Sequence, residues 1–306
     1  MSDLLAISSA VGGAKVTIYN FATGSPVLVA GRTGGATSFS ATSRIAPDEL
    51  HFLWKADGVG GGGIVGTHPE DFQALVGSAL WTLQDTPASG NGQAVMPRDC
   101  VFFHRASGDV LWRRYVYNDN DPRKIVRAPV ATGVGATVYT LAGTRIGACD
   151  LGGDIVYYYD RPAIGFGAIR RYHLTTGQLA DLTAPLAYAP STLRVDGSGR
   201  VLTADGTRYR IYTAAGTLLA TYTVTGTSNV AAAWAQDGLS FWGTNNGAVT
   251  RFRTSDGATL WSAPPGFTAT VSTLDTGPAV LLEAPAGLHV RGTRRGLMLV
   301  GGGLGA

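Results

Sequence analysis

This sequence has little charge and few cysteines. Only 15% of its 306 residues are charged, the formal net charge is +3, and the arginines occur in pairs rather than in blocks. Bulk charge therefore gives no reason to expect a nucleic-acid partner. The two cysteines, Cys100 and Cys149, lack Cys-x-x-Cys spacing. There is no disulfide framework, and we expect both thiols to be reduced and buried.

Long apolar runs and an export signal are also missing. No window approaches 18 consecutive apolar residues, so we expect no membrane insertion. The first residues, MSDLLAISSAVGGAK, carry Asp3 where a secretory signal would carry Lys or Arg, and Ser8 and Ser9 interrupt the apolar stretch. We therefore expect the protein to be made in the cytoplasm without a signal peptide.

Glycine, by contrast, is abundant, with 43 residues spread along the chain among many Thr, Val and Ala. This composition suits short strands and tight turns and argues against disorder or long helices. The length exceeds an ordinary domain of about 150 residues, but propellers often run this long as one unit. We predict one all-β domain over 1–306, with a lead-in at 1–14 and a glycine-rich C-terminal strand or tail at 297–306.

Five segments repeat the same hairpin pattern. Each has a turn glycine preceded, five positions earlier, by an aromatic or β-branched residue: Tyr19, Phe103, Tyr172, Ile211 and Phe252. The turn glycines are Gly24, Gly108, Gly177, Gly216 and Gly257. A small or polar residue before glycine supplies the positive φ of a tight hairpin, and the repeated apolar position keeps one strand face buried.

The spacing of these glycines predicts the architecture. Gly177, Gly216 and Gly257 are 39 and 41 residues apart, and Gly296 follows 39 residues later. A period near 40 residues is typical of a β-propeller with four antiparallel strands in each blade. The interval of 69 residues from Gly108 to Gly177 is too long for one blade and short for two. We predict seven blades, with six or eight as alternatives.

A Gly-x-x-x-Trp pattern ends at Trp81, Trp112 and Trp261. It resembles the tryptophan-docking repeat of PQQ-like (quinoprotein) propellers, which implies that these three tryptophans dock between blades. A quinone enzyme of that family would be expected to have a longer eight-bladed chain and an adjacent pair of cysteines, whereas the cysteines here are 49 positions apart. The family's exported assembly scaffolds carry an export signal. We therefore expect neither family function, and no cofactor.

The best candidates for chemistry are three carboxylates, Asp150, Asp154 and Asp160, beside the tyrosines at 157–159. Glycoside hydrolysis needs two carboxyl groups facing one cleft, and a wall of tyrosines suits sugar stacking. The sequence SRIAPDEL at 43–50 faintly resembles a sialidase motif, but no Asp-box turn follows. The alternative is structural: the same residues are explained as carboxylates of turns and as tyrosines buried in a strand. A glycosidase or depolymerase stays the runner-up, and we predict no catalytic residue.

Metal and nucleophile motifs are not recognisable either. The five histidines never fall at metal-ligand spacing, and His104 and His173 share one repeat position, which favours a structural role. No serine or cysteine belongs to a known nucleophile motif. The glycines at 60–63 are followed by no Lys-Ser/Thr pair, so they indicate a flexible loop rather than a phosphate site. We predict no metal.

Two polar or irregular stretches are candidate contact loops. YNDNDPRK at 117–124 has oxygen ligands at alternate positions but lacks the glycine and glutamate of a calcium loop. DRPAIGFG at 160–167 interrupts the repeats. The residues that we expect to make contacts in these loops are Asn118, Asp119, Asn120, Asp121, Arg161 and Phe166.

Together these features resemble, in style, the propeller-type structural or receptor-binding proteins of tailed phages. This resemblance implies a virion protein of the tail or fibre, present in several copies. Its partners would be other tail proteins and a host-surface glycan or receptor. An intracellular propeller scaffold is a further alternative.

Overall fold

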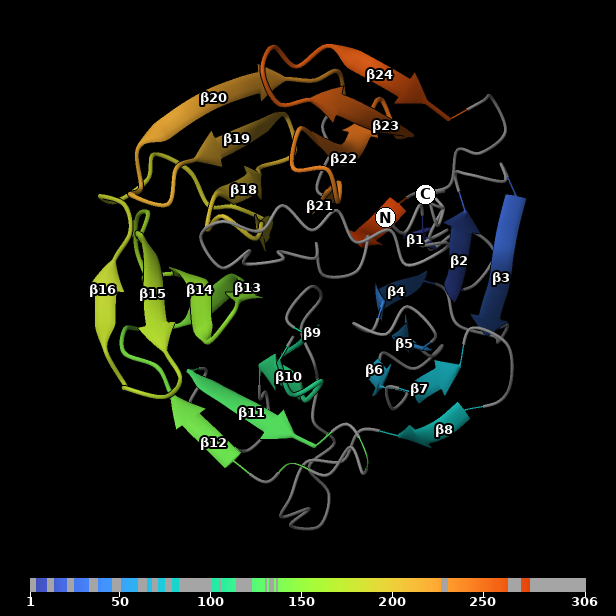
Figure 1. The fold of residues 1–306 in the computed structure, drawn as a ribbon, viewed down its shortest axis with the longest axis horizontal. Helices are drawn as coiled ribbons and strands as arrows, with labels where there is room; N and C mark the ends of the chain where they lie inside the picture. The colour runs from blue at the N-terminus through green and yellow to red at the C-terminus, as the bar shows by residue number, and fades with distance from the viewer. Residues whose placement is uncertain are drawn as a thin grey trace, which may run out of the picture.

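The computed structural model is all-β, and its strands are arranged as sheets around a common centre (Figure 1). The structure describes residues 4–9, 14–20, 25–32, 38–45, 51–59, 65–67, 71–74, 79–82, 101–104, 106–113, 123–129, 131, 135, 137–226, 231–263 and 271–275. In the strands before residue 101 and in 271–275, side chains are described only for Leu5 and Ile45. No helix long and apolar enough to cross a membrane occurs in this described part.

The first half of the chain, together with the late strand β25, forms three antiparallel sheets, whose strands are named from the innermost to the outermost. Sheet 1 has the order β25 (Val271–Asp275), β1 (Leu4–Ser9), β2 (Ala14–Asn20) and β3 (Ser25–Arg32). Sheet 2 has β4 (Ser38–Ile45), β5 (His51–Val59), β7 (Asp71–Ala74) and β8 (Ala79–Thr82), and β6 (Val65–Thr67) also pairs with β5. Sheet 3 has β9 (Val101–Phe103), β10 (Val110–Arg113), β11 (Lys124–Ala128) and β12 (Thr137–Thr140).

The second half contributes three sheets of four strands in plain chain order. Sheet 4 has β13 (Ile146–Gly152), β14 (Ile155–Asp160), β15 (Ile169–His173) and β16 (Leu179–Asp181). Sheet 5 has β17 (Thr192–Val195), β18 (Val201–Ala204), β19 (Arg208–Tyr212) and β20 (Leu218–Thr223). Sheet 6 has β21 (Ala232–Trp234), β22 (Ser240–Asn245), β23 (Ala248–Arg253) and β24 (Thr259–Ser262).

The ring closes by pairing a late strand with the first strands of the chain. β25 lies antiparallel to β1, with Ala6 opposite Asp275, and so completes sheet 1. Each innermost strand contacts the innermost strand of the next sheet, from β25 through β4, β9, β13, β17 and β21 and back to β25 (Figure 1). This closure confirms the predicted propeller fold, in which radial repetition leaves only short, protected strand edges. The tail expected at 297–306 lies outside the described residues.

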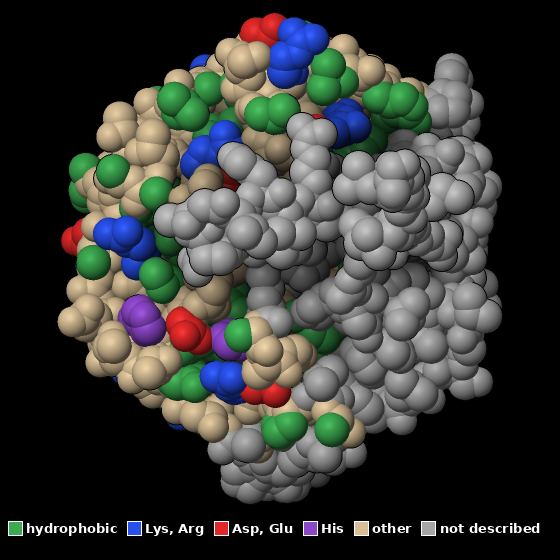
Figure 2. Space-filling view, in the orientation of Figure 1, with side chains coloured by type: hydrophobic (Ala, Val, Ile, Leu, Met, Phe, Trp, Pro, Cys, Tyr) green, Lys and Arg blue, Asp and Glu red, His purple; other side chains and the backbone are tan. Residues whose placement is uncertain are grey.

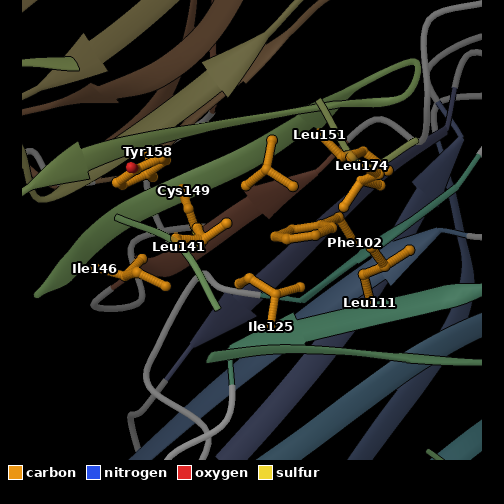
Figure 3. Close-up of a cluster of buried hydrophobic side chains, with 10 residues drawn as sticks. Phe102, Leu111, Ile125, Leu141, Ile146, Cys149, Leu151, Tyr158 and Leu174 are labelled. Atoms are coloured by element: carbon orange, nitrogen blue, oxygen red, sulfur yellow. The ribbon is translucent and has the colours of Figure 1, made fainter. Parts of the chain in front are cut away.

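Both faces of sheet 4 are packed against neighbouring sheets, which explains why β14 is almost continuously buried. In β14, Val156 and Tyr158 point into the cluster shared with sheet 3, whereas Tyr157 points into the cluster shared with sheet 5. Alternation along a strand sends successive side chains to opposite faces. Figure 3 shows the first of these clusters, in which Phe102 and Leu111 of sheet 3 meet side chains of sheet 4.

The hairpin repeat mixes two different turns, and this corrects the alignment of the five segments on their glycines. Gly108 lies between β9 and β10, the two innermost strands of sheet 3, whereas Gly177 lies between β15 and β16, the two outermost strands of sheet 4. Their φ angles are 76° and 69°, so both turns need the same left-handed conformation and look alike in sequence. The interval of 69 residues therefore does not measure whole blades. The described strands form six sheets, and the predicted number of seven is not confirmed.

Candidate functional site

One end of sheet 4 carries an exposed apolar loop between β14 and β15. Ile164 is 92% exposed and Phe166 is 51% exposed, although both are large apolar side chains. Arg161, at the start of the loop, is exposed, and so is Arg145, whose carbonyl oxygen accepts a hydrogen bond from the Arg161 amide at 2.8 Å. Two of the predicted contact residues, Arg161 and Phe166, are therefore exposed in one loop. We call residues 161–167 the apolar loop.

Hydrogen bonds fix the base of the apolar loop. The Asp160 amide donates to the Ala168 carbonyl at 3.0 Å, the Gly167 amide donates to the Tyr159 hydroxyl at 3.0 Å, and the Leu186 amide donates to the Gly167 carbonyl at 2.8 Å. A Cβ added at Gly167 would overlap the Asp160 carbonyl oxygen, so only glycine fits there. The loop thus starts and ends on a rigid support.

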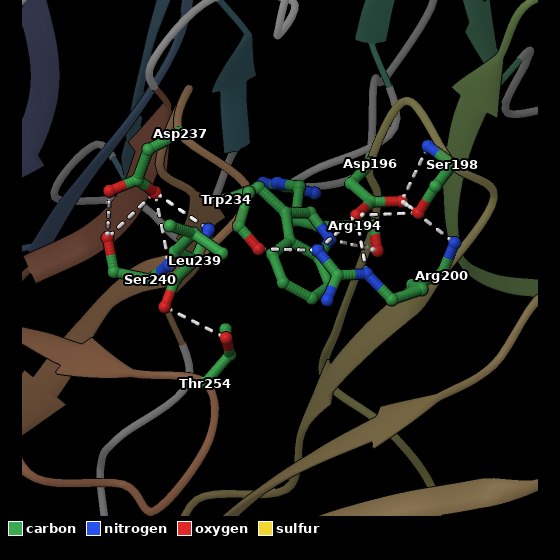
Figure 4. Close-up of polar contacts among 10 residues, drawn as sticks. Arg194, Asp196, Ser198, Arg200, Trp234, Asp237, Leu239, Ser240 and Thr254 are labelled. Atoms are coloured by element: carbon green, nitrogen blue, oxygen red, sulfur yellow. Dashed lines mark hydrogen bonds and ion pairs between the residues drawn. The ribbon is translucent and has the colours of Figure 1, made fainter.

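The opposite end of the sheets carries polar turns. We call the turn between the two innermost strands of a sheet its inner turn. In sheet 6, the Asp237 carboxylate accepts hydrogen bonds from the Leu239 amide at 2.9 Å and from the Ser240 hydroxyl at 3.0 Å (Figure 4). Arg251 of β23 donates to the same carboxylate at 2.7 Å. Such a bond network holds the turn against the third strand of its own sheet.

Sheets 3 and 5 hold their inner turns in the same chemical way. In sheet 5, Asp196 accepts from the Ser198 hydroxyl at 2.9 Å and from the Arg200 Nε at 2.7 Å, and Arg200 continues to the Gly238 carbonyl in sheet 6 (Figure 4). In sheet 3, Arg127 of β11 donates to Asp109 at 2.7 Å and to the Ser107 hydroxyl at 3.0 Å. We call each of these groups an Asp–Ser–Arg clip.

Sheet 3 has an additional histidine that joins its clip to sheet 4. The His104 Nε2 atom lies 2.6 Å from an Asp154 carboxylate oxygen, and the His104 Nδ1 atom lies 2.9 Å from the Ser107 Oγ atom. The His104 side chain is 8% exposed and the Asp154 side chain 45%. Figure 2 shows histidine and acidic side chains side by side on the face that it presents. We call His104, Ser107 and Asp154 the His–Ser–Asp cluster.

The sequence does not predict this cluster. The repeat position of His104 indicates a structural role, and Ser107 carries no motif. Asp154 stands out only as a possible glycosidase carboxylate. Their meeting depends on the packing of sheet 3 against sheet 4, since Asp154 lies 50 residues after His104. A serine three residues after a histidine in a tight turn is the only local signal.

The three candidate carboxylates do not share one cleft. Asp154 and Asp160 flank β14 at opposite ends, about 20 Å apart at the rise of a strand. Asp160 accepts from the Thr144 amide at 2.9 Å and pairs with Arg170 at 3.1 Å. Asp150 accepts from the Val195 amide at 2.8 Å, which links sheet 4 to sheet 5.

The tyrosines at 157–159 are buried and form no exposed wall for a sugar ring. Tyr158 donates from its hydroxyl to the Ala142 carbonyl at 2.7 Å. Burial raises the pKa of Tyr158 to about 12, so this hydroxyl stays neutral and available as a donor.

The tryptophans expected to dock between blades occupy different positions. Trp112 lies in β10, the second strand of sheet 3, and is completely buried. Trp261 lies in β24, the outermost strand of sheet 6, packs partly buried against a cluster that includes Leu5, and meets Trp242 edge-on at 5.6 Å. Trp81 lies in the outermost strand β8 of sheet 2. The other predicted contact residues, Asn118, Asp119, Asn120 and Asp121, lie outside the described residues, as do Cys100 and the loop at 60–63.

A buried polar network lies in sheet 5. Arg210 pairs with Asp205 at 2.6 Å and lies over the ring of Tyr188 at 3.8 Å. Burial opposes ionisation of Asp205, but the bonds from Arg210 and from the Thr207 and Arg208 amides outweigh it and lower the Asp205 pKa. The Tyr188 hydroxyl lies 2.7 Å from the Thr203 hydroxyl and 2.9 Å from that of Tyr212. The network joins a connecting segment to sheet 5.

No group of three or more His, Cys, Asp or Glu side chains that would hold a metal ion occurs in the part of the chain that the structure describes. Cys149 is buried and reduced inside the cluster between sheets 3 and 4, in line with the prediction for this residue.

Comparison with known proteins supports the fold. No protein-family model matches the chain, and no curated protein sequence matches it. A chain from the crystal structure of a nidogen/laminin complex is similar in structure, with a TM-score of 0.61 over 89% of this chain and 97% of that chain. The sequence identity is 11%, so the similarity shows a propeller-type fold and nothing more specific.

Proposed function

We propose that this β-propeller is a binding module built into a larger particle, and that the apolar loop is its principal contact site. The more specific form of the proposal is a tail or fibre protein of a tailed phage, present in several copies. The observation that carries the binding proposal is the 92% exposure of Ile164 together with the half-exposed Phe166.

Exposing these two apolar side chains to water is unfavourable in free energy, and a partner that covers them would remove this penalty. Burying a large apolar side chain contributes roughly 1.5–3 kcal/mol. Single exposed apolar residues are ordinary on protein surfaces, whereas two on one short loop expose more apolar area than a single residue does. The hydrogen bonds at Asp160 and Gly167 hold the ends of the loop before any partner arrives. A preorganised loop loses little conformational entropy on binding, which favours affinity.

The surroundings of the loop indicate the chemistry of the partner. The exposed Arg145 and Arg161 are joined by a backbone hydrogen bond beside the apolar residues. A complementary surface would therefore have an apolar pocket for Ile164 and Phe166 and a carboxylate at its rim. We expect that partner to be another protein of the particle.

The virion setting is supported by the sequence's resemblance in style to propeller proteins of tailed phages. Several copies of a rigid ring would multiply weak contacts to a host-surface glycan or receptor through avidity. The structural neighbour comes from a complex of two proteins, which supports the use of this fold for protein–protein binding.

The test has two stages. Mass spectrometry and imaging of purified particles from the source should find the protein as a stoichiometric component. Its absence from particles would overturn the virion form of the proposal.

A photo-crosslinking amino acid at position 166 should then capture a neighbouring protein of the same particle. The paired substitution Ile164→Ser with Phe166→Ser should abolish incorporation of the purified chain into particles. Leu218→Ser with Leu219→Ser is the matched control, because these large apolar side chains are also exposed (50% and 56%) but lie on β20. Equal incorporation of both pairs would overturn the role of the loop.

A further inference from the structure

We infer that Ser107 is an activated nucleophile for carboxylic esters, with His104 as its general base and Asp154 as the positioning residue. This activity is independent of the proposed binding function and uses the opposite end of sheet 4. The three side chains come from two sheets and meet at 2.9 Å and 2.6 Å. These distances lie within the range of a nucleophile–base pair and of a base–carboxylate pair.

The hydrogen bonds allow one neutral tautomer of His104. The Ser107 amide approaches the His104 Nδ1 atom at 3.3 Å, and an amide can only donate. Nδ1 is therefore an acceptor, and the ring proton resides on Nε2, from which it is donated to Asp154. The Ser107 hydroxyl must then donate to Nδ1. This is the arrangement in which a histidine can take the serine proton.

A cation lies beside the proposed nucleophile, the Ser107 hydroxyl oxygen. Arg127 donates from Nη2 to Ser107 Oγ at 3.0 Å, and the Asp109 amide donates to the same atom at 3.2 Å. Both donors stabilise the negative charge that develops on Oγ as its proton passes to His104. The turn around the serine is exposed, whereas the His104 side chain is almost completely buried, so the base is shielded and the nucleophile is accessible.

The other sheets show that holding an inner turn does not require this histidine. Ser240 and Ser198 belong to Asp–Ser–Arg clips in which the described bonds involve only aspartate and arginine. His173 ends β15, where its Nδ1 atom accepts the Thr175 and Thr176 amides at 3.3 Å and 3.5 Å. Among the side chains that the structure describes, a histidine lies between a serine hydroxyl and a carboxylate only at His104.

The proposed reaction is acyl transfer through the serine. Ser107 Oγ attacks the ester carbonyl carbon and forms a C–O bond to it, while the hydroxyl proton passes to His104 Nδ1. The resulting imidazolium is held by Asp154. The alcohol leaves with that proton, and an acyl-serine remains. Water then attacks the acyl carbon, with His104 again taking and returning a proton, so that the carboxylic acid is released. Because Ser107 is on an exposed turn, we expect small esters or esters borne on a larger molecule.

The experiment uses the intact chain with a fluorophosphonate probe and with p-nitrophenyl acetate. Fluorophosphonate should label Ser107, as mapped by mass spectrometry, with loss of fluoride. Ser107→Ala should abolish this labelling, and His104→Asn should slow it by about 10²-fold or more, which is the lower range for a general base. Asparagine keeps an acceptor for the Ser107 amide. Ser198→Ala is the matched control and should label like the unaltered chain.

Asp154 is tested by the pair Asp154→Asn and Asp154→Glu. A positioning role requires that Asn reduces the labelling rate and that Glu restores part of it, at unchanged melting temperature. If Ser107→Ala unfolds the chain, Ser107→Cys gives a second measurement, since its thiol should react with iodoacetamide faster than that of Ser198→Cys. Failure of Ser107 to label, or equal rates with and without His104, would overturn the inference. Labelling should persist in the Ile164→Ser, Phe166→Ser chain, which separates this inference from the proposed function.

Discussion

Large apolar side chains are buried in one region of this molecule and exposed in another. Between sheets 5 and 6, Phe241 lies 5.3 Å from the ring of Tyr209 and 5.2 Å from that of Phe252, and all three are buried. In the apolar loop, Ile164 and Phe166 are exposed. The residue type alone therefore does not tell whether a large apolar side chain of this protein serves stability or binding. Side chains between sheets hold the ring together, whereas those on the loop remain available for a partner.

The greatest loss of stability is expected for tryptophan in the interior. Trp112→Ala should lower the free energy of unfolding by about 3–5 kcal/mol, because a completely buried indole leaves a large cavity. Trp261→Ala should cost less, because Trp261 is only partly buried. Denaturant unfolding of both variants measures the difference. Equal losses, or lost ligand binding without lost stability, would contradict a packing role.

Tyr209→Phe should cost about 2 kcal/mol, since the Thr244 amide, 2.7 Å from the Tyr209 hydroxyl, would lose its buried acceptor. Burial raises the pKa of Tyr209 to about 12, above the unfolded value of about 10. The neutral hydroxyl therefore stabilises the fold fully below about pH 10, and this part is lost as the pH rises toward 12. Unfolding measured from pH 8 to 12 should show a shallower loss for the Phe variant. Parallel curves would argue against this assignment.

Asp205→Asn should cost about 1 kcal/mol at pH 7, by loss of a charge-assisted bond to Arg210. The Asp205 pKa is lowered in the folded chain, so its carboxylate stabilises the fold above the unfolded pKa of about 3.9. That contribution is lost as the pH falls through the lower, folded pKa. The two chains should thus converge in stability on acidification. A difference that stays constant from pH 7 to 2 would show that ionisation is not involved.

The least change in stability is expected in the apolar loop. Ile164→Ser with Phe166→Ser should alter the free energy of unfolding by less than about 0.5 kcal/mol, as is usual for exposed positions. Thermal melting of the free chain checks this. A loss comparable to that of Trp112→Ala would mean that the loop packs against its own ring, and the contrast between the two regions would disappear.

Part of the fold can be predicted from the sequence because it depends on local chemistry. Turn glycines such as Gly177 and Gly257 have positive φ, and their spacing indicates hairpins of similar size. The place of a turn within its sheet cannot be predicted in this way, since Gly108 has the same φ preference in a different turn. This ambiguity explains why the preferred number of blades is not confirmed by the six described sheets.

An all-β chain of four-stranded units follows from the sequence alone, since apolar periodicity and turn glycines act through neighbours along the chain. How the ends meet, and which polar groups face each other, depends on tertiary packing. β25 pairs with β1 although most of the chain lies between them in sequence. Asp154 reaches His104 because sheet 4 packs on sheet 3. Such contacts depend on the stacking of whole sheets, and no local pattern in the sequence encodes them.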